Sequence, residues 1–407
     1  MANTLNLGNG NWATKEDSLL GYNSENGNFK PLSFDFTRAS SATVVNKAGL
    51  IETVGSGEPR IDFKDDAKGA LLLEPSRSNL ITYSEDTTEW DKNATPINTS
   101  NTTISPNGYR NADSVIVNSI SEGFYDFSIG TVNSGASYTF SIFIKHISGI
   151  ETIRFGGSGS GFGGDNNNVF NIKNGTVVSV ASGNTLSVND YGNGWYRLIA
   201  TKTASSTATA AWVLYGDENA EIQYSAWGVQ VEQGSYATSY IPTSGSAVTR
   251  VADECFNQPP TGIISQTELT VFYQGIVERL GGNDGHAISL SQSLDASGSS
   301  RILLYRNSGN GNVYIYVQDS TTQFSTPLLV NSDPQVNDKY AIAIKDNDLV
   351  VYCNGVKVSE NNSGTIPSMQ YVYLNKWNNQ INEQNKIKEV KLYNTRLSNS
   401  ELAALTQ

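Results

Sequence analysis

The chain has 407 residues and a net charge of −12 at pH 7. An acidic field repels phosphate backbones, and no cluster of Lys and Arg overrides it locally, which disfavours nucleic-acid binding. No apolar run approaches the roughly 20 residues that a membrane helix needs. The first residues show neither the basic region nor the apolar core of a secretory signal, so we expect none.

The composition favours an all-β protein with more than one domain. Hydrophobic residues make up 38% and charged residues 16%, while Gly and Tyr number 37 and 20. Ser, Thr, Asn and Gly fill the remainder. This mixture suits many short strands joined by polar turns, and it lacks the Ala, Leu, Glu and Lys of helical bundles. The length predicts two or three domains.

Residues 1–33 are rich in Asn and Gly and carry isolated apolar side chains, among them Trp12, Leu19, Leu20 and Tyr22. They show no sustained helical or strand period. Alone, such a segment cannot bury enough apolar surface to offset its conformational entropy. We expect an extended arm that becomes ordered by docking on a partner, on a neighbouring subunit or on the following domain; a solvated tail is the alternative.

Residues 34–85 are a succession of short extended pieces broken by Gly, Pro and charged turns, and residues 227–254 are punctuated in the same way. We interpret these two stretches as a frame that begins and ends a first domain, residues 34–254. Inside it, several runs alternate between apolar and polar residues. In Ser137–His146, SYTFSIFIKH, one face is apolar and the other is mixed. Short antiparallel strands at this spacing indicate a sandwich or jelly roll.

A change of composition with two adjacent prolines, residues 243–266, marks the boundary to a second sandwich, residues 255–407. The run Val313–Val317, VYIYV, has a clear period of two. Asn354-Gly355 lies between two strand-like runs, which predicts a two-residue hairpin. Ser398 and Glu401 have the spacing of a capping box at the start of one short helix.

The chain has too few cysteines and histidines for a metal site built from these residues. Only Cys255 and Cys353 occur, far apart in the sequence, together with two histidines. We interpret the cysteines as buried free thiols, with a bridge that closes the last domain as the alternative. A zinc site built from Cys and His is close to excluded, and we expect no metal and no cofactor.

No catalytic constellation stands out. His146 ends a strand-like run, His286 lies in a polar loop before Ala287, and no GxSxG motif accompanies either one. Asp65 with Asp66, and Asp217 with Glu218, are adjacent in sequence. Their side chains therefore point apart on an extended chain, unlike the paired carboxylates of glycosidases. We expect no catalytic residue and no enzymatic activity.

The segment Gly159–Gly164 formally matches GxGxxG, but asparagines follow it instead of a helix. We therefore predict a flexible loop between strands rather than a nucleotide site. Asp165 with Asn166 could at most contribute to a weak calcium site, because calcium needs six to eight oxygen ligands.

Of the six tryptophans, Trp195, Trp212 and Trp227 lie within strand patterns and are predicted to be core residues. Trp377 instead opens a polar run at a predicted sheet end, beside Asn375, Asn378 and Asn379. An exposed ring that stacks on a pyranose, with amides that bind its hydroxyls, is typical of a saccharide site. The alternative is a loop tryptophan packed against its own sheet or a neighbouring subunit.

Several separated phrases over residues 1–255 resemble one domain family, and they occur in the family's order. They are GNGNWATKEDSLLGYN, FDFTRASSATVVNKAGLIETV, GALLLEPSRSNLITYSE, NGWYR and TSYIPTSGSAVTRVAD. The family belongs to bacteriophage tail and fibre proteins, with a concanavalin A-like, carbohydrate-binding-module-like jelly roll, and the first phrase resembles versions from phages of Bacteroidetes. The phrases DNDLVVYCNGVKV and IKEVKLYNTRLSNSELAAL more weakly resemble laminin-G-like sandwiches.

The resemblance implies a bacteriophage virion protein of the fibre or adhesin type. Two consecutive antiparallel β-sandwiches would follow the arm of residues 1–33. Through Trp12, Leu19, Leu20 and Tyr22, the arm would dock on other virion proteins. The sandwiches would bind host cell-surface glycans, and fibre proteins of this kind are usually homotrimers. The expected location is the virion surface, after synthesis in the host cytoplasm and without membrane insertion.

Two alternatives remain beside this interpretation. One is a tailspike that degrades capsular polysaccharide, although the short repeats of a β-helix are absent. The other is a purely structural head or tail component without a ligand. The sequence leaves open whether the protein belongs to a head fibre or a tail fibre, which glycan it binds, and the symmetry of the oligomer.

Overall fold

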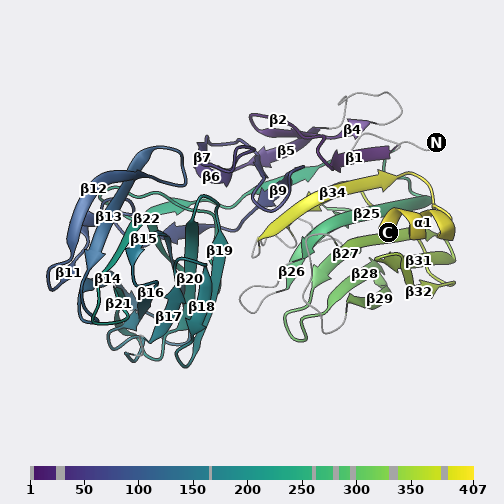
Figure 1. Cartoon of the computed structure of the whole chain (residues 1–407). Coiled ribbons are helices and arrows are strands. Elements are labelled where there is room, and N and C mark those ends of the chain that lie inside the picture. Colours follow the sequence, from purple (N-terminus) through teal and green to yellow (C-terminus); the bar gives the residue numbers. More distant parts are fainter. Residues whose placement is uncertain are drawn as a thin grey trace. The chain divides into compact units, whose positions relative to one another are not determined.

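The computed structural model describes residues 4–23, 33–164, 167–258, 263–277, 284–293, 299–329, 338–376 and 384–407. Nearly all of its regular structure is antiparallel β-strand (Figure 1). Within these ranges the helices are a 3-10 turn, η1 (Thr87–Glu89), and one α-helix, α1 (Asn399–Thr406). The all-β class with antiparallel sandwiches predicted from the composition and the strand pattern is confirmed.

The chain forms two compact units, each assembled from separate segments. Unit 1 comprises Met1–Ser41, Val54–Ser76 and Val251–Gln407, and unit 2 comprises Ala42–Thr53 and Arg77–Arg250. This division differs from the predicted boundaries at 33/34 and 254/255, because residues 34–41 and 54–76 belong with the C-terminal part of the chain. The polypeptide passes from one unit to the other four times.

Unit 1 contains two nine-stranded sheets. Sheet A has the order β32 (Val356–Asn361), β31 (Asp348–Cys353), β30 (Lys339–Lys345), β25 (Glu268–Val277), β34 (Asn385–Tyr393), β1 (Thr4–Gly8) and β4 (Tyr22–Asn23), and β9 (Ala70–Leu73) joins β34 and carries β8 (Arg60–Asp62). Sheet B has the order β2 (Ala13–Lys15), β3 (Ser18–Leu20), β5 (Ser33–Thr37), β24 (Glu254–Asn257), β33 (Tyr371–Leu374), β26 (Gly285–Ser291), β27 (Ser300–Arg306), β28 (Val313–Asp319) and β29 (Thr321–Leu329). One apolar cluster draws its side chains from both sheets, so the two form a sandwich.

Strand pairing explains why the N-terminal segment belongs to unit 1. In sheet A, Leu5 of β1 lies opposite Leu392 of β34. In sheet B, Phe36 of β5 lies opposite Cys255 of β24. Leu5, Phe36 and Cys255 all belong to the shared core. The described part of the predicted arm is therefore ordered by pairing with strands of its own unit, among them the C-terminal strand β34, which lies outside the following domain that the sequence predicted over residues 34–254.

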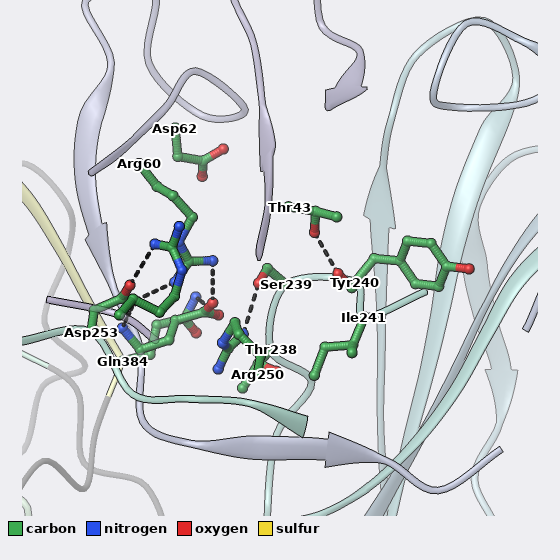
Figure 2. A network of polar contacts seen from close by, with 12 residues as sticks. Thr43, Arg60, Asp62, Thr238, Ser239, Tyr240, Ile241, Arg250, Asp253 and Gln384 are labelled. Carbon is green, nitrogen blue, oxygen red and sulfur yellow. Dashed lines mark hydrogen bonds and ion pairs between the residues drawn. The ribbon is translucent and has the colours of Figure 1, made fainter. Parts of the chain in front are cut away.

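Charged side chains inside unit 1 tie its segments together. The two guanidinium nitrogens of Arg60 bind Glu74, at 2.7 Å, and Asp253, and Arg38 binds the other oxygen of Asp253 at 2.9 Å. Figure 2 shows the Arg60 guanidinium directed at Asp253. All four side chains have no exposed surface. Burial alone lowers the pKa of Arg60, but the charges of Asp253 and Glu74 offset this and raise it above its ordinary value.

The C-terminal part of unit 1 follows the predicted local signals. Ser398 and Glu401 form the capping box that starts α1. Asn354, with a φ of 47°, and Gly355, with a φ of 81°, connect β31 to β32 as a tight hairpin. Leu402 of α1 packs on Phe272, Val350 and other side chains of sheet A, so the helix covers part of that sheet's outer face. The two cysteines are buried free thiols, as predicted.

Unit 2 contains two six-stranded sheets. Sheet C has the order β11 (Lys92–Asn93), β14 (Gly123–Val132), β21 (Ala208–Gly216), β16 (Thr152–Ser158), β17 (Asn168–Asn171) and β18 (Thr176–Ser179). Sheet D has the order β12 (Ile97–Ile104), β13 (Arg110–Val117), β22 (Ile222–Gln233), β15 (Ser137–Gly149), β20 (Trp195–Thr203) and β19 (Asn184–Asp190). Two short pairs complete the unit, β6 (Ala42–Val45) with β7 (Ile51–Val54) and β10 (Arg77–Asn79) with β23 (Val248–Arg250).

The alternation in β15 explains how unit 2 is layered. Its apolar face, which includes Phe140 and Ile142, enters the main core together with Trp212. Its mixed face carries Phe143, which packs against Trp227 at 5.3 Å between ring centroids. Phe143 thereby joins a second, smaller cluster that includes Trp195 and residues of β6 and β7. The prediction that Trp195, Trp212 and Trp227 are core residues is confirmed.

We predict that Arg60→Met destabilises the protein by about 3–5 kcal/mol, because it leaves the buried Glu74 carboxylate without its cation and Asp253 with Arg38 alone. The matched control is Lys357→Met, which removes the exposed pair of Lys357 and Glu360 and should leave stability nearly unchanged, because solvent screens such a pair. Urea denaturation followed by circular dichroism measures both. Equal midpoints for the two variants would contradict the structural importance of this buried cluster.

Candidate functional site

The outer face of sheet B carries a group of partly exposed aromatic side chains. In β28, Val313, Ile315 and Val317 enter the core, and Tyr314 and Tyr316 point to the opposite face. This follows from the period of two in an extended strand. The neighbouring strand β27 repeats the pattern, with core residues at 302 and 304 and the partly exposed Tyr305 on the outer face.

Strand register brings three of these rings into one row across the sheet. Tyr305 lies opposite Tyr314 of β28 and opposite His286 of β26. The centroids of Tyr305 and Tyr314 are 5.6 Å apart with planes at 20°, and those of His286 and Tyr305 are 5.7 Å apart with planes at 19°. We call His286, Tyr305 and Tyr314 the aromatic row. His286 therefore lies in a strand, and the loop expected for it from the sequence is corrected.

Polar groups surround the row on its outer side. The Asn310 amide donates to the Tyr314 hydroxyl at 2.9 Å. Next to the row, the Tyr316 hydroxyl lies 2.8 Å from the Thr322 hydroxyl and donates to the Gln318 amide oxygen at 3.3 Å. The Arg301 guanidinium lies over the Tyr316 ring, 5.2 Å from its centroid. The face thus combines ring surfaces with hydroxyl, amide and guanidinium groups.

Two members of the aromatic row, His286 and Tyr305, are uncharged at neutral pH. Burial lowers the pKa of His286 to about 4, although the nearby Asp284 carboxylate acts in the opposite direction. Burial, reinforced by Asp284 and the neighbouring tyrosines, raises the pKa of Tyr305 to about 12. The imidazole therefore stays neutral and the phenol stays protonated at pH 7. A ligand at this face meets hydrogen-bonding groups and rings rather than a fixed charge on the row.

Such a face has two uses in proteins. Aromatic rings with polar handles bind saccharides, because a ring contacts the apolar face of a sugar while hydroxyl and amide groups bind its hydroxyls. Cross-strand aromatic pairs also stabilise a sheet by about 0.2–1 kcal/mol each. The first use also employs the hydroxyl, amide and guanidinium groups that lie beside Tyr314 and Tyr316, whereas the second needs only the rings.

Of the saccharide site predicted around Trp377, the structure describes only Asn375. Trp377, Asn378 and Asn379 lie outside the described residues. Asn375 follows β33 and is 3% exposed. Its amide donates to the backbone oxygen of Asp253 at 3.2 Å, inside unit 1. Asn375 is thus a buried structural residue at the end of its strand.

The four side chains predicted to dock the arm contact their own unit. The Trp12 indole donates to the backbone oxygen of Lys68 at 3.0 Å and packs against the core. Leu19 is fully buried in that core. Leu20 and Tyr22 are partly exposed, in β3 and β4. Within the described chain, Trp12 and Leu19 therefore stabilise unit 1.

The described ranges contain neither a cluster suited to a metal ion nor a helix suited to crossing a membrane. Within them, no three His, Cys, Asp or Glu side chains gather in a way that could hold a metal ion. Neither helix there has the length and hydropathy that crossing a bilayer requires. The candidate site therefore consists of the aromatic face and its polar surroundings.

The comparisons with known proteins concern parts of the fold. No protein-family model matches the chain. No curated protein matches it either. Among solved structures, one likeness is to the CBM40 of the Ruminococcus gnavus IT-sialidase bound to α2,3 sialyllactose, with 13% identity, a TM-score of 0.30, and coverage of 35% of this chain and 83% of that one.

Two further structures show likeness of the same order. Domain 4 of AbnA, an extracellular arabinanase from Geobacillus stearothermophilus in complex with arabinotriose, has 16% identity, a TM-score of 0.31, and coverage of 43% of this chain and 81% of that one. A heptameric pentraxin from Limulus polyphemus has 13% identity, a TM-score of 0.26, and coverage of 34% of this chain and 70% of that one. Each match spans less than half of this chain.

We predict that the His286 imidazole remains neutral down to a pH of about 4. Because its folded-state pKa lies below the unfolded value, its contribution to stability is present above about pH 6.5 and is lost as the pH falls through about 4. An NMR titration of the His146→Gln variant, in which His286 is the one remaining histidine, measures this directly. A midpoint near 6.5 would show that the ring is not buried in the row.

Proposed function

We propose that the chain is a non-enzymatic, glycan-binding β-sandwich protein of a bacteriophage virion surface. It binds saccharide through the aromatic row of His286, Tyr305 and Tyr314 together with Tyr316. The observation that carries this proposal is that register places the three rings in one uncharged row, next to polar groups that can bind sugar hydroxyls.

The chemistry of the face favours a sugar over other ligand classes. Nucleic acid is disfavoured by the net charge of −12. A peptide strand would need a free sheet edge, whereas the row lies in the middle of sheet B, on strands that have partners on both sides. A pyranose needs flat ring surface and converging hydrogen-bonding groups, and β26 to β29 supply both.

The virion setting rests on the sequence phrases that resemble phage tail and fibre proteins. In that setting, unit 1 presents the glycan-binding face to the host cell, and the protein is held on the particle by other virion proteins. Immunogold labelling of intact particles with an antibody against the chain tests the location separately from binding. Particles without label would contradict the setting and leave glycan binding to be tested by itself.

The direct test of binding is Tyr314→Ala, measured by isothermal titration with the best saccharide from a glycan array. Loss of one ring and one hydroxyl should weaken binding about tenfold. Tyr314→Phe keeps the ring and should fall between the wild type and the alanine variant. Tyr109→Ala is the matched control, since Tyr109 is a 73% exposed tyrosine of unit 2 that is remote in sequence from the row, and it should bind as the wild type does.

A blank glycan array, or unchanged affinity of Tyr314→Ala together with a lower melting temperature, would show that the row only stabilises the sheet. Loss of capsular polymer viscosity on incubation with the purified protein would instead indicate an enzyme that degrades polysaccharide.

A further inference from the structure

The strand β19 (Asn184–Asp190) forms one edge of sheet D, and in the described chain its one strand partner is β20 (Figure 1). An edge strand offers backbone N–H and C=O groups to any strand that can lie alongside it. The seven residues of β19 pair with β20 without a register shift, from Asn184 opposite Lys202 to Asp190 opposite Tyr196. The edge is therefore regular along its whole length.

The other edges of the four large sheets are irregular or short in the described chain. The strands β12, β18, β29 and β32 are edges of four or more residues, and each has a register shift in the pairing with its neighbour. The strands β2, β4, β8 and β11 have two or three residues each. Bulges and short strands protect a sheet edge from pairing with another chain. Among these edges, β19 alone has neither protection.

The chain around β19 carries little charge. Residues 174–189 contain no Asp, Glu, Lys or Arg. Asp190 ends the strand, and its carboxylate accepts a hydrogen bond from the backbone N–H of Gly192 at 2.7 Å, in the turn that follows. In a chain with a net charge of −12, most surfaces of two copies repel each other. The β19 edge is where a second copy can approach with little like-charge repulsion.

The side chains of β19 divide between two faces. Leu186 and Val188 are half-buried and pack against the main core of unit 2. Thr185 and Ser187 are exposed on the other face, as the period of two in an extended strand requires. Leu186 and Val188 thus keep part of their apolar surface in solvent. A further strand alongside β19 would cover more of that surface, which is favourable.

The sequence of β19, NTLSVND, is complementary to itself in one antiparallel register. A two-fold axis at Ser187 places Leu186 opposite Val188 of the second copy, and Val188 opposite its Leu186. On the other face Thr185 lies opposite Asn189, and the two copies of Ser187 meet at the axis. Apolar side chains therefore pair with apolar ones and polar with polar, and cross-strand pairs of this kind stabilise a sheet.

Other registers match the strand less well. An axis at Val188 would place Leu186 opposite the Asp190 carboxylate. An axis at Leu186 would place Val188 opposite the Asn184 amide. With the axis at Ser187, all seven residues are paired. Asp190 then lies opposite Asn184, so no two like charges face each other across the pair. The sequence therefore favours one register, centred on Ser187.

We propose that β19 is a homodimerisation edge, at which two copies of this chain pair antiparallel about a two-fold axis at Ser187 and join their sheets D into one. The partner is a second copy because the strand is complementary to itself and the chain around it carries little charge to repel that copy. A two-fold edge predicts an even-numbered assembly, unlike the homotrimer that the sequence resemblance implies. This inference does not depend on glycan binding.

The test is the mass of the full chain in solution, measured by light scattering coupled to size exclusion over a range of concentrations. The wild type should reach twice the 44.0 kDa chain mass. Ser187→Lys should weaken association by about tenfold, because like charges meet directly across the axis. The matched control is Ser100→Lys, the same substitution at an exposed position of β12, on the opposite edge of sheet D. It should associate as the wild type does.

A cysteine scan tests the axis itself and does not depend on how well the lysine variant folds. Ser187→Cys should form a disulfide between copies, since residues directly opposite in an antiparallel pair have Cα atoms about 4.5–5.5 Å apart, within the range of a disulfide. Thr185→Cys and Asn189→Cys should not crosslink alone, and they should crosslink with each other when the two variants are mixed. The native cysteines are buried and should not interfere.

A monomeric wild type at every concentration measured would overturn the proposal. So would a dimer whose association Ser187→Lys leaves unchanged while circular dichroism shows the variant to be folded. A trimer that retains its mass in Ser187→Lys would assign assembly to another surface and overturn the proposal as well.

Discussion

Unit 1 depends on a buried ion cluster that joins segments from distant parts of the chain. Arg38 comes from the N-terminal segment, Arg60 and Glu74 from the second, and Asp253 from the start of the third. Asp253 has the central position, because its carboxylate also accepts from the backbone N–H of Glu74 at 2.8 Å. Two cations and two anions balance one another, and backbone groups take further hydrogen bonds. A hydrophobic core of the same volume could be as stable, but it would not fix which segments come together. The cluster therefore ties the three interleaved segments of unit 1 to one another.

The sequence predicted the elements better than their assembly. Period-two patterns in β15 and β28, the Asn354-Gly355 hairpin and the capping box at Ser398 are local signals, and each is present in the structure. The assignment of residues 34–41 and 54–76 differs because strand partners are not local. The frame formed by residues 34–85 and 227–254 does exist as strand pairs, with Thr37 opposite Glu254 and Arg77 opposite Arg250. The first pair lies within unit 1 and the second within unit 2, however, so the two stretches do not enclose one domain.

The candidate site could be predicted only in its parts. The run VYIYV predicts a strand with tyrosines on one face. The pattern of a single strand does not predict which residues of the neighbouring strands lie opposite it. His286 and Tyr305 enter the row through register with β26 and β27, and register follows from turns and bulges elsewhere in the sheet. For Asn375, the prediction from the sequence was wrong. A polar residue after a strand was predicted to bind sugar at the surface, but its left-handed φ of 65° and its hydrogen bond to Asp253 place it inside unit 1. An asparagine amide can satisfy buried backbone groups as readily as it can bind a sugar.

The tyrosines and the neutral histidine of the row suit the uncharged ligand that we propose for this acidic protein. A lysine or a charged histidine there would attract the carboxylates of this acidic chain and impose a preference for anionic ligands. Burial keeps His286 neutral and Tyr305 protonated. Attraction of the proposed ligand to the row would therefore come from ring surface and hydroxyl groups, and salt screens such interactions little. Tyrosine also loses little side-chain entropy on binding, since it has only two torsions and its ring is rigid. Cross-strand stacking restricts those torsions before any ligand arrives. The packing that orders the sheet thereby also preorganises its outer face for binding.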